Sequence, residues 1–236
     1  MKNQQLIKQV KLRIRQLRNI FRDVLNGHIF SMASKHSPPV KYQNKIELRQ
    51  KLNPNDAKMH NLNLAIKAIE TTHILPGEIF SFWKIVGNPS KKNGFIESRS
   101  IVGNQITTSV GGGLCQLSGL IYYMSLLSNL EIIERYNHSV DIYNDETRFT
   151  PLGSDATVVY GYKDSKIKNN HTSPINFTFD VNENSIAIEL NHSLSLSRND
   201  VQFDTIQATP TEIVIHTKIN NKKSTKSIYR KPTFKE

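Results

Sequence analysis

The amino-acid sequence predicts an α+β fold in which a helix carrying the only cysteine packs on a central antiparallel sheet, followed by a β-rich C-terminal part. Two helical patterns before residue 73 and a third after residue 114 supply the α component. Short alternating runs between turn residues follow from residue 131 onward and supply the β component. With 236 residues and a single cysteine, the chain makes no intramolecular disulfide and depends on a buried core.

We divide the chain into three parts on these patterns. Residues 1–48 are expected to form a basic amphipathic helix and a linker, residues 49–190 the main domain, and residues 191–236 a β-rich extension with a basic tail. The linker is predicted from two prolines with polar flanks within residues 35–48.

The first helix is amphipathic, because its apolar residues recur at alternating spacings of three and four. Its other face is basic, and residues 1–22 hold seven Lys and Arg residues without an acidic residue. A helix of this kind docks on an anionic membrane surface or packs on the domain, and both options stay open here. The apolar residues are Ile7, Val10, Ile14, Leu17, Phe21 and Val24.

The second helix is expected to start at Asn53-Pro54, since Asn caps helix N-termini and Pro suits the first helical position. Its apolar face ends near Thr72, and a Pro-Gly turn then leads into a strand-like aromatic run at residues 80–83. The other predicted elements are an extended segment at 99–110, a helix from Cys115 to about Ser128, strand-like runs at 131–136, 138–143 and 155–162, antiparallel strands at 174–181, 185–190 and 211–219, and a frayed end at 222–236.

The net charge of +11 is concentrated at the two ends of the chain, and the segment between them is near neutral. A nucleic-acid-binding domain usually has a basic folded face with interleaved aromatic residues, so no nucleic-acid partner is expected. The N-terminus lacks the unbroken apolar core of a secretory signal, and no run of 18 apolar residues exists. A cytoplasmic or membrane-peripheral location is therefore expected, and the oligomeric state stays open.

Cys115 stands directly after three glycines and at the start of a predicted helix. The positive end of the helix dipole lowers a thiol pKa at such a position. A neighbouring histidine would form an ion pair with the thiolate and act as general acid. His138 is the candidate for that role, and Asp155 is the candidate for the group that orients the imidazole. Both are placed at the beginning of predicted strands.

Further residues are expected to support this site. An oxyanion hole would use the Cys115 N–H together with a side-chain amide, and glycines without a Cβ would let a substrate approach the thiol. Glu134 and Arg135 alternate on a predicted strand, so at most one faces the cleft, and a structural ion pair is the expected role of either. The supporting residues are Gly111, Gly112, Gly113, Gln105, Gln116 and Arg135, with Gln105 and Gln116 as the amide donors.

Two other interpretations of the cysteine stay open. In one, Cys115 is an inert, packed residue of a buried helix. In the other, cysteine, histidine and aspartate bind zinc, although the chain has no second cysteine and no HxxxH or HxH pair. The sequence contains no P-loop and no dinucleotide-binding glycine motif, so no cofactor is expected.

The segments PGEIFSFWKIVG (76–87), GGGLCQLS (111–118), LEIIERYNHS (130–139) and PLGSDATVVYGY (151–162) resemble the VanW family, whose members are known from glycopeptide-resistance gene clusters and from many other bacteria. The resemblance covers about residues 50–190. It implies an accessory protein of cell-wall or antibiotic-response biology without an established reaction. The residues on the family motifs are Gly111, Gly112, Gly113, Cys115, Gln116, Glu134, Arg135, His138, Gly153, Asp155, Ala156 and Thr157.

The order of a cysteine-bearing helix, a histidine strand and an aspartate strand is also similar to transglutaminase-like and papain-like enzymes. This second similarity rests on element order alone. It implies a cysteine-dependent amidase, peptidase or acyl transferase, with a cell-wall peptide or its precursor as substrate. The alternative is a non-enzymatic, envelope-associated module that binds a wall peptide or glycan.

Overall fold

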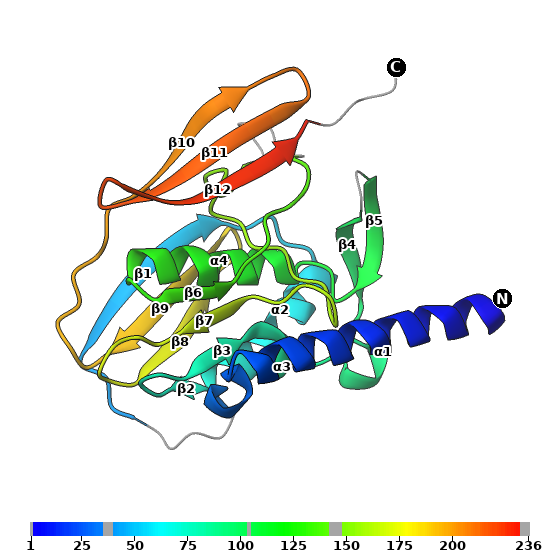
Figure 1. Cartoon of the computed structure of the whole chain (residues 1–236), viewed down its shortest axis with the longest axis horizontal. Helices are drawn as coiled ribbons and strands as arrows, with labels where there is room; N and C mark the ends of the chain where they lie inside the picture. Colours follow the sequence, from blue (N-terminus) through cyan, green and yellow to red (C-terminus); the bar gives the residue numbers. More distant parts are fainter. Residues whose placement is uncertain (1, 35–39, 103–104, 142–147, 232–236) are drawn as a thin grey trace.

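The computed structural model describes residues 2–34, 40–102, 105–141 and 148–231. It is a mixed fold of helices and antiparallel sheets (Figure 1), as the sequence predicts. The helices are α1 (Lys2–Leu25), α2 (Asp56–Glu70), α3 (Phe82–Val86) and α4 (Leu114–Leu127), with short 3-10 turns η1 (His28–Ser31) and η2 (Lys91–Asn93). Within the described ranges, no helix is long and apolar enough to cross a membrane.

A four-stranded antiparallel sheet forms the centre of the molecule. Its strand order is β1 (Asn44–Lys51), β9 (Ser185–His192), β8 (Ile175–Val181) and β2 (His73–Ile74). Helix α2 contacts β8, and α4 contacts β1 and β9. Apolar side chains of both helices and of the inner strands are fully buried between these layers, including Leu62, Leu117, Leu120 and Ile188. Helix α4 is apolar on nearly all sides, as expected for a helix enclosed by the core.

The remaining strands form three smaller antiparallel units. A three-stranded sheet has the order β3 (Ile79–Ser81), β7 (Lys166–Lys168) and β6 (Glu131–Glu134). The hairpin of β4 (Glu97–Val102) and β5 (Gln105–Val110) precedes α4. Strands β10 (Val201–Ala208), β11 (Glu212–Ile219) and β12 (Lys222–Arg230) form a C-terminal sheet.

The glycine turn before α4 is confirmed and has a conformational cause. Gly111 has φ +80° and Gly113 has φ +99°, a region that disfavours other residues. A Cβ on Gly111 would lie 2.7 Å from the Pro89 Cβ, and one on Gly113 would lie 2.8 Å from the Lys58 Cγ. The chain can therefore enter α4 at this angle only with glycine at these two positions.

Several predicted elements differ in the structure. Asn55 rather than Asn53 caps α2, because its side chain accepts a hydrogen bond of 2.9 Å from the Lys58 N–H. Residues 44–48 of the predicted linker belong to strand β1, which pairs with β9 along its whole length. The aromatic run at 80–83 is the end of β3 and the beginning of α3.

The predicted strands that carry His138 and Asp155 are wrong. Both residues lie in loops. The backbone groups of these loops form hydrogen bonds with side chains and with distant backbone groups instead of with a neighbouring strand. The His138 N–H donates to the Asp155 carboxylate, and the Thr157 N–H donates to the Tyr136 carbonyl. Part of the predicted strand 138–143 falls outside the described residues. The predicted frayed end is also wrong up to Arg230, because β12 pairs with β11.

Candidate functional site

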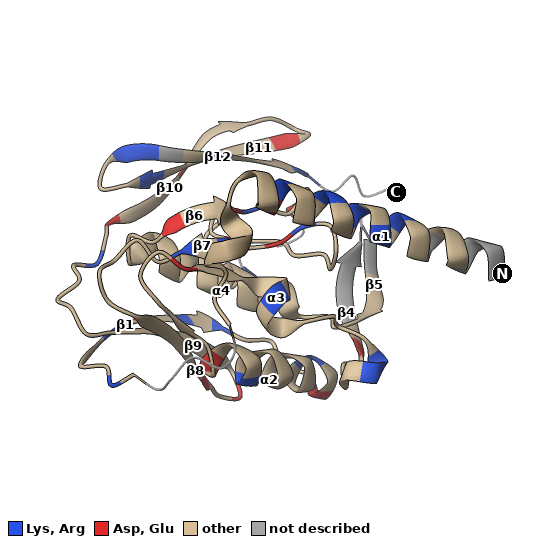
Figure 2. Ribbon diagram, turned by 60° about the horizontal axis from the view of Figure 1, so that its bottom comes forward, with Lys and Arg blue, Asp and Glu red and all other residues tan. Residues whose placement is uncertain are grey.

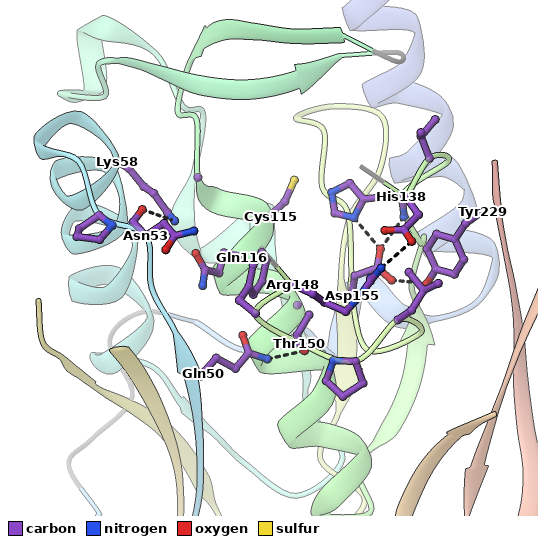
Figure 3. A pocket seen from close by; sticks show the side chains of 18 of the residues that line it. Gln50, Asn53, Lys58, Cys115, Gln116, His138, Arg148, Thr150, Asp155 and Tyr229 are labelled. Carbon is purple, nitrogen blue, oxygen red and sulfur yellow. Dashed lines mark hydrogen bonds and ion pairs between the residues drawn. The ribbon is translucent and has the colours of Figure 1, made fainter. Parts of the chain in front are cut away.

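A cleft of about 320 Å³ opens at the N-terminal end of α4 (Figure 3). One wall comes from the end of β1 and the start of α2, with Gln50 and Lys58. The other wall comes from the loops that follow β6 and from the C-terminal sheet, with His138 and Tyr229. Cys115 lies between these walls, so segments far apart in the sequence meet at the thiol.

Cys115 is the second residue of α4 and is only partly buried. Its sulfur lies 3.6 Å from the Thr157 Oγ1 and 3.7 Å from the Val158 carbonyl oxygen, both long contacts of the hydrogen-bonding type. The first turn of a helix has backbone N–H groups without an intrahelical acceptor. The Gln116 N–H of this turn donates to the Gly113 carbonyl at 3.0 Å. The thiol stands in this first turn, at the positive end of the helix dipole.

Asp155 fixes His138 through two hydrogen bonds to the same carboxylate oxygen. The ring Nδ1 lies 2.6 Å from the Asp155 Oδ2, and the His138 backbone N–H donates to that oxygen at 2.7 Å. Because Nδ1 is hydrogen-bonded to Asp155, Nε2 is the ring nitrogen that can exchange a proton with a group in the cleft. This is the relation of base and orienting carboxylate that nucleophilic catalysis uses.

The second oxygen of Asp155 is held by Arg135 and Tyr229. The Arg135 Nη2 lies 3.1 Å from the Asp155 Oδ1, and the Tyr229 hydroxyl donates a short hydrogen bond to the same atom. Arg135 also donates to the carbonyls of Gly153 and Asp155 and to the Ser227 hydroxyl, while its side chain is only 7% exposed. Arg135 therefore takes part in an ion pair, the role expected of it, although it lies just after β6 and not on the predicted strand.

These contacts shift the pKa values of Asp155 and His138 in opposite directions, in each case toward the charged form. Burial raises the pKa of Asp155, but hydrogen bonding to His138 and the charges of Arg135 and His138 outweigh it and lower the value to about 2. Burial lowers the pKa of His138, but its hydrogen bonds and charge interactions with Asp155 and Cys115 raise it to about 10. The pair is thus held as carboxylate and imidazolium near neutral pH.

The His138 imidazolium lowers the pKa of the Cys115 thiol. Burial would raise the pKa of Cys115, but the hydrogen-bonding and charge influence of the neighbouring His138 brings it below the usual value. Figure 3 shows the Cys115 and His138 side chains on the same side of α4. The sulfur itself is within hydrogen-bonding range of the Thr157 hydroxyl and the Val158 carbonyl. The arrangement favours a thiolate beside an imidazolium in an accessible cleft.

The structure brings together Cys115, His138, Asp155 and the supporting Arg135. Gly113 lines the cleft with Cys115, His138 and Asp155, whereas Arg135 supports Asp155 from behind and Gly111 and Gly112 shape the turn before α4. The Gln116 amide nitrogen donates to the Lys51 carbonyl at 3.0 Å, which ties it to the wall formed by β1. Gln105 begins β5, and its side chain lies outside the described part of the structure. A role of either glutamine in an oxyanion hole stays a prediction.

One contributor could not be found from the sequence pattern. Tyr229 lies 74 residues after Asp155, on a strand that the sequence predicts as a frayed end. Thr157 is identified only as a residue on a family motif, and it lies in a loop where the sequence predicts a strand. Within the described ranges, no group of three or more His, Cys, Asp or Glu side chains is arranged to hold a metal ion.

Comparison with known proteins identifies the middle of the chain. The model of a family described as VanW like protein matches residues 57–191. The chain is 33% identical over 121 residues to the "Uncharacterized protein YoaR" of Bacillus subtilis (strain 168), which covers 51% of this chain and 38% of that protein. It is 36% identical over 112 residues to the "Vancomycin B-type resistance protein VanW" of Enterococcus faecalis (strain ATCC 700802 / V583), covering 48% of this chain and 41% of that protein.

The chain thus spans about two-fifths of the length of the curated relatives that it matches. No solved structure matches it. The matched residues 57–191 include Cys115, His138 and Asp155 but exclude Gln50 and Tyr229. The cleft is therefore built partly from segments on either side of the family domain.

Proposed function

The chain belongs to the VanW family, and we propose that it is a cysteine-dependent enzyme of the amidase, peptidase or acyl-transferase type. One observation carries the proposal, namely the convergence of Cys115, His138 and Asp155 at one cleft in the order thiol, imidazole and carboxylate. A helix-borne cysteine beside a histidine that an acid or an amide orients is the arrangement of papain-like and transglutaminase-like enzymes. This likeness is one of local chemistry and supports a reaction class only.

The first half of the reaction uses the thiolate as nucleophile. The Cys115 sulfur attacks the carbonyl carbon of an amide, forming a C–S bond and a tetrahedral oxyanion. We assign the stabilisation of that oxyanion to the Cys115 backbone N–H in the first turn of α4, together with a side-chain amide. Collapse breaks the C–N bond, and the proton of the His138 imidazolium goes to the departing amine. The products of this half are a thioester on Cys115 and a free amine.

The second half regenerates the enzyme. Neutral His138 takes a proton from water, or from an amine if the reaction is an acyl transfer, while the oxygen or nitrogen attacks the thioester carbon. The C–S bond breaks and the electron pair returns to sulfur as thiolate. Asp155 keeps the imidazole in one orientation through both halves, since its oxygen holds the Nδ1 side at 2.6 Å.

The substrate class comes from the family and from the cleft. A relative of this chain is named for vancomycin resistance, and glycopeptide antibiotics of that type act on cell-wall peptides, so we propose a wall peptide or its precursor as substrate. The cleft offers both charged and amide side chains, among them Lys58, Arg148 and Gln50. A cavity of about 320 Å³ suits a few residues of a peptide better than a folded protein.

The test is peptide turnover by the full chain and by Cys115→Ala. Wall-derived peptides would be incubated with each protein, and cleavage or transfer followed by mass spectrometry, with hydroxylamine added to trap a thioester. We expect turnover by the native chain only, together with a trapped acyl product. Ser118→Ala serves as the matched control, because Ser118 lies one turn further along α4 and bonds only to backbone carbonyls.

Turnover by Cys115→Ala at the native rate would overturn the proposal. Peptide binding without turnover in either protein would favour the alternative, a non-enzymatic module that uses the same cleft to recognise a wall peptide or glycan. Isothermal titration with the same peptides separates these results, because a binding module keeps its affinity in Cys115→Ala.

A further inference from the structure

Helix α1 turns a mainly polar face toward the protein and most of its apolar side chains toward solvent, the reverse of an ordinary surface helix. The half-buried residues of its middle and end are Leu12, Gln16, Asn19 and Asp23, which recur at the spacing of one helix face. The exposed apolar residues lie about half a turn away from them. They are Ile7, Val10, Ile14, Leu17, Phe21 and Val24, each between 44% and 65% exposed.

The inward face is held by polar contacts. The Arg22 Nη2 lies 2.6 Å from the Glu134 Oε2, and the Lys166 Nζ lies 2.6 Å from the Asp23 Oδ1. The Asn19 amide donates to the Gly161 carbonyl, and a Cβ on Gly161 would overlap Leu12. These contacts leave the helix little freedom to roll, so its apolar face stays outward.

The exposed apolar surface is larger than scattered surface residues explain. Leu17, Phe21 and Leu25 are 65%, 63% and 70% exposed, and Phe30 just beyond the helix is 89% exposed. A continuous apolar stripe of this kind on a folded protein marks an interaction surface. Figure 1 shows α1 along the outside of the molecule, with its N-terminal half projecting beyond the body.

The charge beside the stripe indicates what covers it. Residues 2–22 contain seven basic residues and no acidic residue. Lys11, Arg13 and Arg18 are exposed, and Figure 2 shows Lys and Arg along α1. An apolar stripe flanked by cations matches the boundary between the headgroups and acyl chains of an anionic bilayer. A second copy of the chain fits less well, because two α1 helices facing each other would bring like charges together with no acid to pair them.

We propose that α1 docks the protein on an anionic lipid surface, lying in the plane of the interface with Ile14, Leu17 and Phe21 buried among the acyl chains. Polar contacts on the opposite face keep the folded domain attached above the bilayer. The surface lies outside the cleft and does not depend on any reaction there.

The experiment is co-sedimentation of the full chain with vesicles of phosphatidylglycerol and phosphatidylcholine in equal parts, and with vesicles of phosphatidylcholine alone. We expect binding to the anionic vesicles that weakens with added salt, and much weaker binding to the neutral ones. The double variant Leu17→Ser with Phe21→Ser should bind the anionic vesicles at least about tenfold more weakly, because two large apolar side chains leave the acyl region.

Two controls keep the result specific. Ile206→Ser with Ile228→Ser removes apolar side chains of similar exposure, 49% and 45%, from the C-terminal sheet, and should leave vesicle binding unchanged. Lys11→Glu with Arg18→Glu keeps the stripe intact and should abolish the preference for anionic vesicles. Absent or salt-independent vesicle binding by the native chain would overturn the proposal. So would a concentration-dependent dimer that Leu17→Ser with Phe21→Ser dissolves while vesicle binding is unchanged.

Discussion

Two clusters of charged side chains meet at neighbouring residues, Glu134 and Arg135, and they serve different purposes. Arg135 belongs to the cleft cluster, which we define as Cys115, Arg135, His138, Asp155 and Tyr229. Glu134 belongs to the anchor cluster, which joins α1 to the sheet of β3, β7 and β6. This cluster is defined as Arg22, Asp23, Glu134, Asp164 and Lys166.

Both clusters contain a buried carboxyl with a displaced pKa. The pKa of Asp155 falls to about 2, because His138 and Arg135 outweigh burial. The pKa of Asp164 rises to about 6, because burial and the charge of Glu134 outweigh its hydrogen bonds to Ser81 and Trp83. A displaced pKa therefore does not by itself mark a functional site. The difference is that the cavity at the cleft cluster contains a thiol beside an imidazole. The anchor cluster also borders a cavity, but its side chains form ion pairs with one another and hydrogen bonds that join α1 to the domain.

The largest predicted effect comes from removing the carboxylate of the cleft cluster. Asp155→Ala leaves the Arg135 guanidinium buried without its ion pair, and breaking a buried pair in this way costs about 3–5 kcal/mol of unfolding free energy. Urea unfolding followed by circular dichroism measures the loss. Asp155→Asn should lose less, because an amide oxygen still accepts from Arg135. If Asp155→Ala were as stable as the native chain, the Asp155 carboxylate would not stabilise the loops that carry Arg135 and His138.

The second prediction concerns the thiol. His138→Ala removes the imidazolium that lowers the Cys115 pKa, so alkylation by iodoacetamide at neutral pH should slow by at least about tenfold, and its midpoint should move toward ~8.5. The alkylation rate across pH measures both. Asp164→Asn in the anchor cluster is the matched control and should leave the rate unchanged. An identical profile for His138→Ala would separate Cys115 from His138 and remove the basis of the proposed reaction.

The comparison also explains what the sequence could predict. Helices α2 and α4 and strands β8, β9 and β11 follow from apolar periodicity, which is a local signal. Strand β1 was missed because it is an edge strand whose side chains are mostly polar. Cys115, Arg135, His138 and Asp155 of the cleft cluster were predicted as candidate site residues, but Tyr229 was not, since only the pairing of β12 brings it to Asp155. Contacts between distant segments leave no periodic trace in the sequence.

The third prediction is a stability change in acid. Asp155 has a folded pKa of about 2 against an ordinary value of 3.8, so it contributes stability above pH 3.8 that is lost as the pH falls toward 2. The shift corresponds to about 2 kcal/mol. Urea midpoints measured from pH 5 downward should fall more steeply in the native chain than in Asp155→Asn. Parallel curves would show that the carboxylate gains nothing from His138 and Arg135.

The smallest predicted effect belongs to the anchor cluster and tests whether the clusters act independently. Arg22 is 43% exposed in its ion pair with Glu134, so Arg22→Ala should cost only about 0.5–1 kcal/mol of unfolding free energy. Glu134 keeps Lys166 as a partner at 3.1 Å, and Arg135 next to it keeps all its hydrogen bonds. Thermal unfolding and the alkylation rate of Cys115 should be measured on the same sample. A slower thiol in Arg22→Ala would mean that α1 reaches the cleft through β6, and the separation of the two clusters would then be wrong.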